Sequence, residues 1–157
     1  MMLARPILAL GLALAIALPV AAVAQTPAAY RPGLGDLMTM TVQPRHLKLA
    51  LAGREKNWAY AAYEWHELEE ALEHIAKQVP KWRDLDIGQL MAATVKQPLD
   101  EVEAAIKASD GQRFDAAFRQ LTDACNACHK SANLAVIVIK VPDISAFPNQ
   151  DFRATKP

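Results

Sequence analysis

Apolar residues recur every three or four positions along most of the chain, which is the spacing of one face of an α-helix. This spacing predicts four helices, over about 34–52, 57–79, 86–109 and 112–130. The second is the clearest, with Asn57 as an N-cap and Pro80 after its end. Four amphipathic helices with short connections predict an all-α protein, an antiparallel four-helix bundle over about residues 34–132.

Three residues interrupt the helical patterns. Gly53 is expected to end the first helix, because glycine is common just beyond helix C-termini. Pro44 is expected to kink or split that same helix. Pro98 is expected to divide the third helical region into two pieces, since the residue before a proline avoids helical backbone angles.

The tail after the last helix, residues 133–157, has a different pattern. Residues 134–141 are apolar and rich in β-branched side chains, and Pro142 follows them. This predicts a single extended segment. One strand cannot form a sheet, so we expect the segment to pack along the bundle. The remainder, 143–157, is loop-like.

The N-terminus carries the features of an export signal. One basic residue, Arg5, precedes the apolar run 7–18, and Ala22-Val23-Ala24 supplies a small-residue cleavage site. The run is shorter than the roughly 20 apolar residues of a transmembrane helix. Residues 1–24 are therefore predicted to be a signal peptide, which leaves 25–157 as one domain in the periplasm with no integral membrane span. The alternative is an uncleaved membrane anchor.

Composition narrows the class of protein. A chain of 157 residues that is 52% apolar and 22% charged is typical of one globular domain. Its 17 basic residues balance its 17 acidic ones, which argues against a protein that grips nucleic acid through phosphates. Its two cysteines are too few for a disulfide-stapled scaffold.

Both cysteines lie in the motif Cys125-Asn126-Ala127-Cys128-His129, near the end of the last predicted helix. C-x-x-C-H is the attachment sequence for c-type haem. The thiols lie on one side of a helix, add across the two haem vinyl groups and form thioethers, while the adjacent histidine reaches the iron. We expect the second ring nitrogen of His129 to donate to a carbonyl or carboxylate. The predicted cofactor is one covalently attached haem c.

The same motif has other uses: a disulfide, a thioredoxin-type redox pair, or half of a zinc site. A thioredoxin pair belongs to a βαβ unit, which the pattern lacks, and a zinc site needs further ligands from elsewhere in the chain. Export favours haem, because c-type haem is attached in the exported compartment. The helix that carries the motif also has an apolar stripe that would wall a haem, namely Phe114, Phe118 and Leu121.

A helical bundle with one C-x-x-C-H near the end of its last helix resembles the class II c-type cytochromes, the cytochrome c′ and cytochrome c556 group. Residues 125–130 match the common C-x-A-C-H-K form of that site, and the resemblance covers about 34–131. Outside the motif it depends on helix order. The tail departs from the group, whose chains usually stop soon after the haem helix, although 146–152 is similar to endings of small exported c-type cytochromes.

The resemblance implies a monohaem cytochrome that carries electrons between periplasmic redox proteins. The alternative is a five-coordinate protein similar to cytochrome c′, which binds small gases such as NO or CO. The sixth iron position decides between them. In the cytochrome c556 group a methionine of the first helix ligates the iron, whereas cytochrome c′ has an apolar side chain there. The candidates here are Met38, Met40 and His46, each of which has a plain alternative role as core filler or surface residue.

An enzyme is not expected, because no paired acid and base groups mark a substrate pocket. A weak peroxidase would need a polar group near the iron, which His46 or Arg45 could supply.

The second predicted helix bears on possible partners. Its solvated side is expected to carry His66 and His74 together with several acidic residues, which favours a basic redox partner: Glu64, Glu67, Glu69, Glu70 and Glu73. Bundles of this kind often dimerise through their first two helices, so a second copy of the chain is a further candidate partner.

Overall fold

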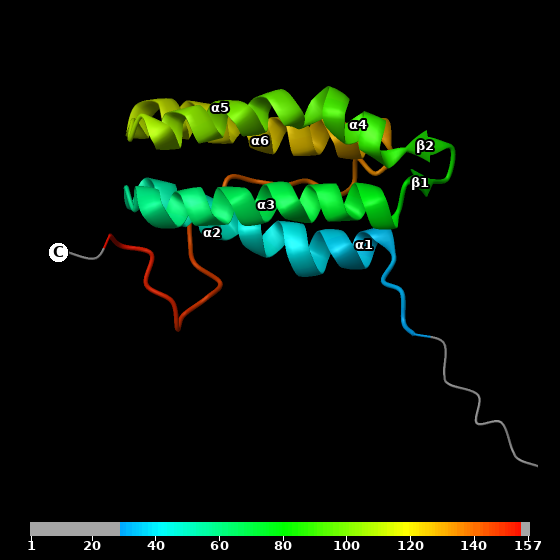
Figure 1. The fold of residues 1–157 in the computed structure, drawn as a ribbon, viewed down its shortest axis with the longest axis horizontal. Helices are drawn as coiled ribbons and strands as arrows, with labels where there is room; N and C mark the ends of the chain where they lie inside the picture. The colour runs from blue at the N-terminus through cyan, green and yellow to red at the C-terminus, as the bar shows by residue number, and fades with distance from the viewer. Residues whose placement is uncertain (1–28, 155–157) are drawn as a thin grey trace, which may run out of the picture. The chain divides into compact units, whose positions relative to one another are not determined.

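A computed structural model describes residues 29–154, so the predicted signal peptide lies outside the described residues. The chain divides into two units, Met1–Tyr30 and Arg31–Pro157, and the description below concerns the second. This unit is mostly helical, as predicted (Figure 1). Its helices are α1 (Leu34–Leu37), η1 (Met38–Val42), α2 (Gln43–Arg54), α3 (Trp58–Gln78), α4 (Ile87–Thr94), α5 (Lys96–Lys107) and α6 (Gly111–Ser131).

The first predicted helix is a continuous helical segment, α1–η1–α2, that changes type in the middle. In η1 the backbone is a π-helix, and the N–H of Gln43 bonds to the carbonyl of Met38, five residues back. Pro44 follows in the first turn of α2 and has no N–H to give to the carbonyl of Met40. The proline therefore divides the segment through a change of hydrogen-bond pattern.

The expectation that Gly53 ends this helix is wrong. Helix α2 continues to Arg54, and the residue with a left-handed backbone after it is Lys56, with φ 54°. The missing side chain of Gly53 serves packing instead. A Cβ atom at Gly53 would lie 2.1 Å from both Cε1 and Cζ of Phe114 on α6, so only glycine allows the two helices this approach.

The third predicted region divides as expected, but not at the proline itself. Helix α4 ends at Thr94 and α5 begins at Lys96, so the break at Val95 lies three residues before Pro98. The reason is that Pro98 has no N–H for the carbonyl of Thr94. A hairpin that the sequence pattern missed precedes α4, with β1 (Lys81–Trp82) antiparallel to β2 (Leu85–Asp86).

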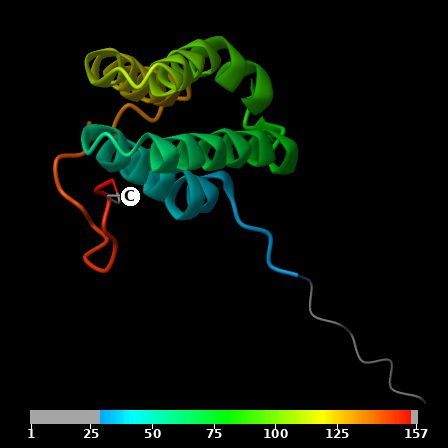
Figure 2. The ribbon, with the colours of Figure 1, turned by 60° about the vertical axis from the view of Figure 1, so that its left-hand side comes forward.

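The helices lie in two layers (Figures 1 and 2). One contains α2 and α3, which pack against each other, and the other contains α5 and α6 with α4 at one end. The main core fills the space between the layers, and its largest fully buried side chains are Leu49, Leu68, Val102, Phe114, Phe118 and Leu121. A smaller cluster, Leu37, Ile75, Ile87 and Met91, lies where α1 and α4 meet α3.

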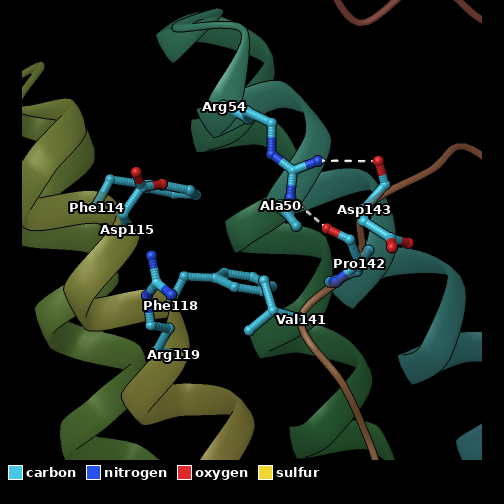
Figure 3. A pocket seen from close by; sticks show the side chains of 9 residues that line it. All are labelled: Ala50, Arg54, Phe114, Asp115, Phe118, Arg119, Val141, Pro142 and Asp143. Atoms are coloured by element: carbon cyan, nitrogen blue, oxygen red, sulfur yellow. Dashed lines mark hydrogen bonds between the residues drawn. The ribbon is translucent and has the colours of Figure 1, made fainter.

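The tail leaves the end of α6 and passes along the helices (orange to red in Figure 1). The extended segment predicted over 134–141 begins only at Ile137, because residues 135–136 form a turn in which the N–H of Ile137 donates to the carbonyl of Leu134. Arg54 of α2 donates to the carbonyls of Pro142 and Asp143, beside a cavity of about 240 Å³ (Figure 3). Further along, Asn57 Nδ2 donates to the carbonyls of Phe152 and Arg153, at 3.3 and 3.2 Å. The ring of Phe152 is buried in the main core.

None of the helices within residues 29–154 combines the length and apolar character that crossing a membrane requires.

Candidate functional site

The predicted haem motif opens onto a cavity of about 260 Å³ that the two layers and the tail enclose together. Cys125, Cys128 and His129 all line it. Most of the other walls are apolar: Leu34, Met38, Val42, Leu72, Trp82, Ile87, Leu90, Met91, Val95, Ala132, Leu134, Ile137 and Ile139. The remaining polar side chains at the cavity are those of Thr39, Gln43 and His46.

The two cysteines are half-buried and do not form a disulfide. Burial raises the pKa of the Cys125 thiol to about 11 and raises that of Cys128 as well. Both groups are therefore thiols at neutral pH. A thioredoxin-type pair depends on a thiol whose pKa is lowered, so this environment does not match that alternative.

His129 makes the hydrogen bond expected of an iron ligand. Its Nδ1 lies 3.0 Å from the carbonyl oxygen of Ile137 in the tail. Because a carbonyl only accepts, Nδ1 carries a proton, and in this tautomer of the neutral ring Nε2 has the lone pair that a metal ligand needs. The carbonyl partner predicted for the second ring nitrogen is thus present.

Asn126, between the two cysteines, holds the same tail segment. Its Oδ1 accepts from the N–H of Ile139 at 2.7 Å, and its Nδ2 donates to the carbonyl of Ile139 at 2.9 Å. Sequence reasoning assigned no role to this residue. No periodic signal marks it, because its partner is a backbone segment whose position depends on the fold.

The two candidate methionines lie in different surroundings. Met38 lines the cavity and is half-buried. Met40 is 62% exposed and is not among the cavity residues. Of the two, only Met38 is placed near the haem motif.

His46 is buried, which overturns its interpretation as a surface histidine: its exposed fraction is 5%. Its Nε2 lies 3.0 Å from Oγ1 of Thr122, and that hydroxyl donates to the carbonyl of Phe118 at 2.9 Å. With its hydrogen used, Oγ1 can only accept, so Nε2 of His46 carries the proton and Nδ1 is a bare acceptor. Burial lowers the pKa of His46 to about 4, so the ring is neutral at pH 7.

This tautomer restricts what His46 can do at the cavity. The only ring hydrogen points to Thr122, so the neutral ring offers no hydrogen-bond donor elsewhere. The neutral ring of His46 therefore cannot donate a hydrogen bond to a group bound in the cavity, as a peroxidase would require. Its Nδ1 can still accept a hydrogen bond or ligate a metal.

The acidic face of α3 is smaller than predicted. Glu64 has an exposed fraction of 3%, and its Oε1 lies 3.9 Å from Nζ of Lys48 on α2. Burial raises the pKa of Glu64. Glu67 accepts from Arg45 of α2 at 3.0 Å. Both carboxylates thus face α2, because α3 buries the turn that carries them.

Of the other residues predicted on that face, His66, His74, Glu70 and Glu73 are exposed, as predicted, and Glu69 is half-buried. His66 lies 3.7 Å from Glu70, and Lys77 lies 3.1 Å from Glu73. Within residues 29–154, no group of three or more His, Cys, Asp or Glu side chains is arranged to hold a metal ion.

Comparison with protein-family models, with curated proteins and with solved structures finds no match for this chain. The function is therefore argued from the site. Its donor set fits a covalently bound haem: two thiols that form no disulfide, one histidine whose Nδ1 is bonded to a carbonyl, and apolar walls.

Proposed function

We propose that the protein is an exported monohaem c-type cytochrome that carries electrons between redox proteins of the periplasm. The observation that carries the proposal is that Cys125, Cys128 and His129 open together onto one largely apolar cavity. Apolar surroundings suit a haem, because they exclude water and thereby set the potential of the iron.

Each residue of the motif has one task in this proposal. The thiols of Cys125 and Cys128 hold the haem through thioethers, and Nε2 of His129 is the proximal ligand. The bound haem supplies an iron that cycles between the ferric and ferrous states. The carbonyl of Ile137 keeps the proton of His129 on Nδ1, so that Nε2 stays free for the metal.

The fold proposed behind this site is an antiparallel four-helix bundle within a single domain, 25–157. Short connections support it, since only residues 55–57 separate α2 from α3 and only 108–110 separate α5 from α6. Contacts between the layers, of α3 with α5 and of α2 with α6, also support it.

The test is expression of the full chain together with a c-type haem maturation system. We expect haem that stays with the polypeptide on a denaturing gel and an absorption spectrum of a c-type cytochrome. The double variant C125A/C128A is expected to lose the covalent haem. Ala127→Ser, an exposed position within the motif, is the matched control and is expected to keep it. A wild-type chain without covalent haem would refute the proposal.

A second candidate function is the binding of small gases such as CO or NO at an iron with an open sixth position. The apolar side chains of Leu34 and Val42 at the cavity favour it, because they offer no ligand. Addition of CO to the ferrous protein separates the two functions. A spectrum that CO leaves unchanged supports electron transfer through a six-coordinate iron, and a shifted spectrum supports gas binding.

In the six-coordinate case, Met38→Ala is expected to make the iron accessible to CO. Met40→Ala, at an exposed position two residues away, is the control and is expected to behave like the wild type. If Met38→Ala has no effect, His46→Gln tests the other candidate ligand at the cavity.

A further inference from the structure

The tail segment 137–139 is fixed to the haem motif at two points. One is the hydrogen bond from Nδ1 of His129 to the carbonyl of Ile137, and the other is the pair of bonds between Asn126 and Ile139. His129 and Asn126 lie three positions apart on α6, so they are neighbours on one helix face. Their partners are two positions apart along the tail.

The amide of Asn126 is fully used in one orientation. One Nδ2 hydrogen goes to the carbonyl of Thr122 at 3.1 Å, the other goes to the carbonyl of Ile139, and Oδ1 accepts from the N–H of Ile139. A flipped amide would place its N–H groups against the N–H of Ile139. The side chain therefore pairs with the tail backbone as a neighbouring strand would.

The chain is held differently on the two sides of the Ile137 carbonyl. Before it, the N–H of Ile137 donates to the carbonyl of Leu134 at 2.9 Å, and the N–H of Leu134 donates to the carbonyl of His129 at 2.8 Å, so a turn joins the segment to the end of α6. The side chains of Val136 and Val138 are 90% and 69% exposed, whereas that of Ile139 is half-buried at the cavity. After the Ile137 carbonyl, the bonds of Asn126 are the side-chain hydrogen bonds that hold the segment.

We propose that Asn126 is a positioning residue for His129: by pairing with Ile139 it holds the Ile137 carbonyl where it accepts the Nδ1 proton of the proximal histidine. The inference rests on the proposed function. A carbonyl acceptor at Nδ1 makes the imidazole a stronger donor to iron and so favours the ferric state. Asn126 therefore lowers the reduction potential through the tail.

The test compares two variants with Gln120→Ala. Asn126→Ala removes both bonds to Ile139, and Ile139→Pro removes the N–H that Oδ1 of Asn126 accepts. Gln120 is an exposed amide on α6 for which the structure gives no side-chain hydrogen bond. In the haem-loaded protein, we expect both pairing variants to raise the midpoint potential. We also expect faster exchange of the His129 Nδ1 proton by NMR and faster amide hydrogen exchange in residues 134–141. Gln120→Ala is expected to match the wild type.

Two results would overturn the inference. One is faster amide hydrogen exchange in the tail with no change in the midpoint potential or in the exchange rate of the His129 Nδ1 proton. Asn126 would then position the tail without affecting His129. The other is a change of the same size in Gln120→Ala. If Asn126→Ala fails to take up haem, Ile139→Pro decides, because it leaves the motif intact. Absence of haem from the wild type refutes the proposed function instead.

Discussion

His46 and His129 both line the cavity, yet their hydrogen bonds leave opposite ring nitrogens free. His129 gives its Nδ1 proton to a tail carbonyl, whereas His46 gives its Nε2 proton to Thr122. The partner that accepts the ring hydrogen thus decides which nitrogen of a histidine is free. For His46 this partner is Thr122, which lies 76 residues away along the chain. The motif around His129 was recognisable from sequence because its members are adjacent, whereas nothing local to His46 indicated burial.

The buried state of His46 has a consequence for acid stability. The pKa of His46 is about 4 in the folded protein and 6.5 in the unfolded chain. Between these values the unfolded chain binds more protons, so stability falls as pH falls. The full effect is about 3 kcal/mol, reached near pH 4.

The measurement that tests this is urea unfolding of the wild type and of His46→Gln at several pH values from 7 to 4, which gives the free energy of unfolding of each protein. Glutamine keeps a donor for Thr122 and has no titrating group. The wild type is expected to lose more stability over this range, by about the amount of the His46 contribution. Parallel profiles for the two proteins would contradict the prediction.

At the scale of elements, helix starts were predictable and helix contacts were not. Asn57, Asp86 and Asp110 each accept a backbone N–H from the first turn of the following helix, which is a local property that the residue type announces. The predictions that Gly53 ends a helix and that Glu64 is exposed were wrong, because they concern contacts between helices. Their roles depend on Phe114 and Lys48, which other helices bring to them.

The close approach of α2 to α6 gives a prediction for Gly53→Ala. Its new methyl group would overlap the ring of Phe114, which is fully buried, so the ring or the two helices must shift. We expect a loss of roughly 1–3 kcal/mol in the free energy of unfolding, as for other overpacked sites.

Gly88→Ala is the matched control for that variant. A Cβ at Gly88 meets its nearest neighbours at 3.5 and 3.7 Å, which is ordinary contact. This variant is expected to unfold at the same urea concentration as the wild type or slightly above it, because alanine favours helix. Equal stability for the two alanine variants would show that α2 and α6 can move apart at little cost.

For the whole molecule, the tail joins regions that are far apart in sequence. It contacts α6 beside the haem motif, crosses α2 at Arg54, and ends with Phe152 in the core near Asn57. Its loop-like character was predictable from composition, but the burial of Phe152 was not. A single aromatic residue in a polar stretch carries no periodicity that would indicate a core position.

Phe152→Ala tests whether the tail stabilises the whole unit. The ring is 7% exposed and stacks on Tyr60 with centroids 5.8 Å apart, so its removal leaves a gap in the main core. We expect a loss of about 3 kcal/mol in the free energy of unfolding. Ile144→Ala, at an exposed position of the same tail, is expected to change it little. If Phe152→Ala lowers the free energy of unfolding no more than Ile144→Ala does, the tail packs on the helices without stabilising them.

The position of Phe152 also bears on the order in which the protein is completed. A chain that is synthesised from its N-terminus delivers Cys125 and Cys128 before Phe147 and Phe152. In the proposed function, the thiols are therefore available for haem attachment while part of the core is still missing and residues 137–139 have not yet paired with the motif. Phe147 and Phe152 would then complete the packing after that attachment.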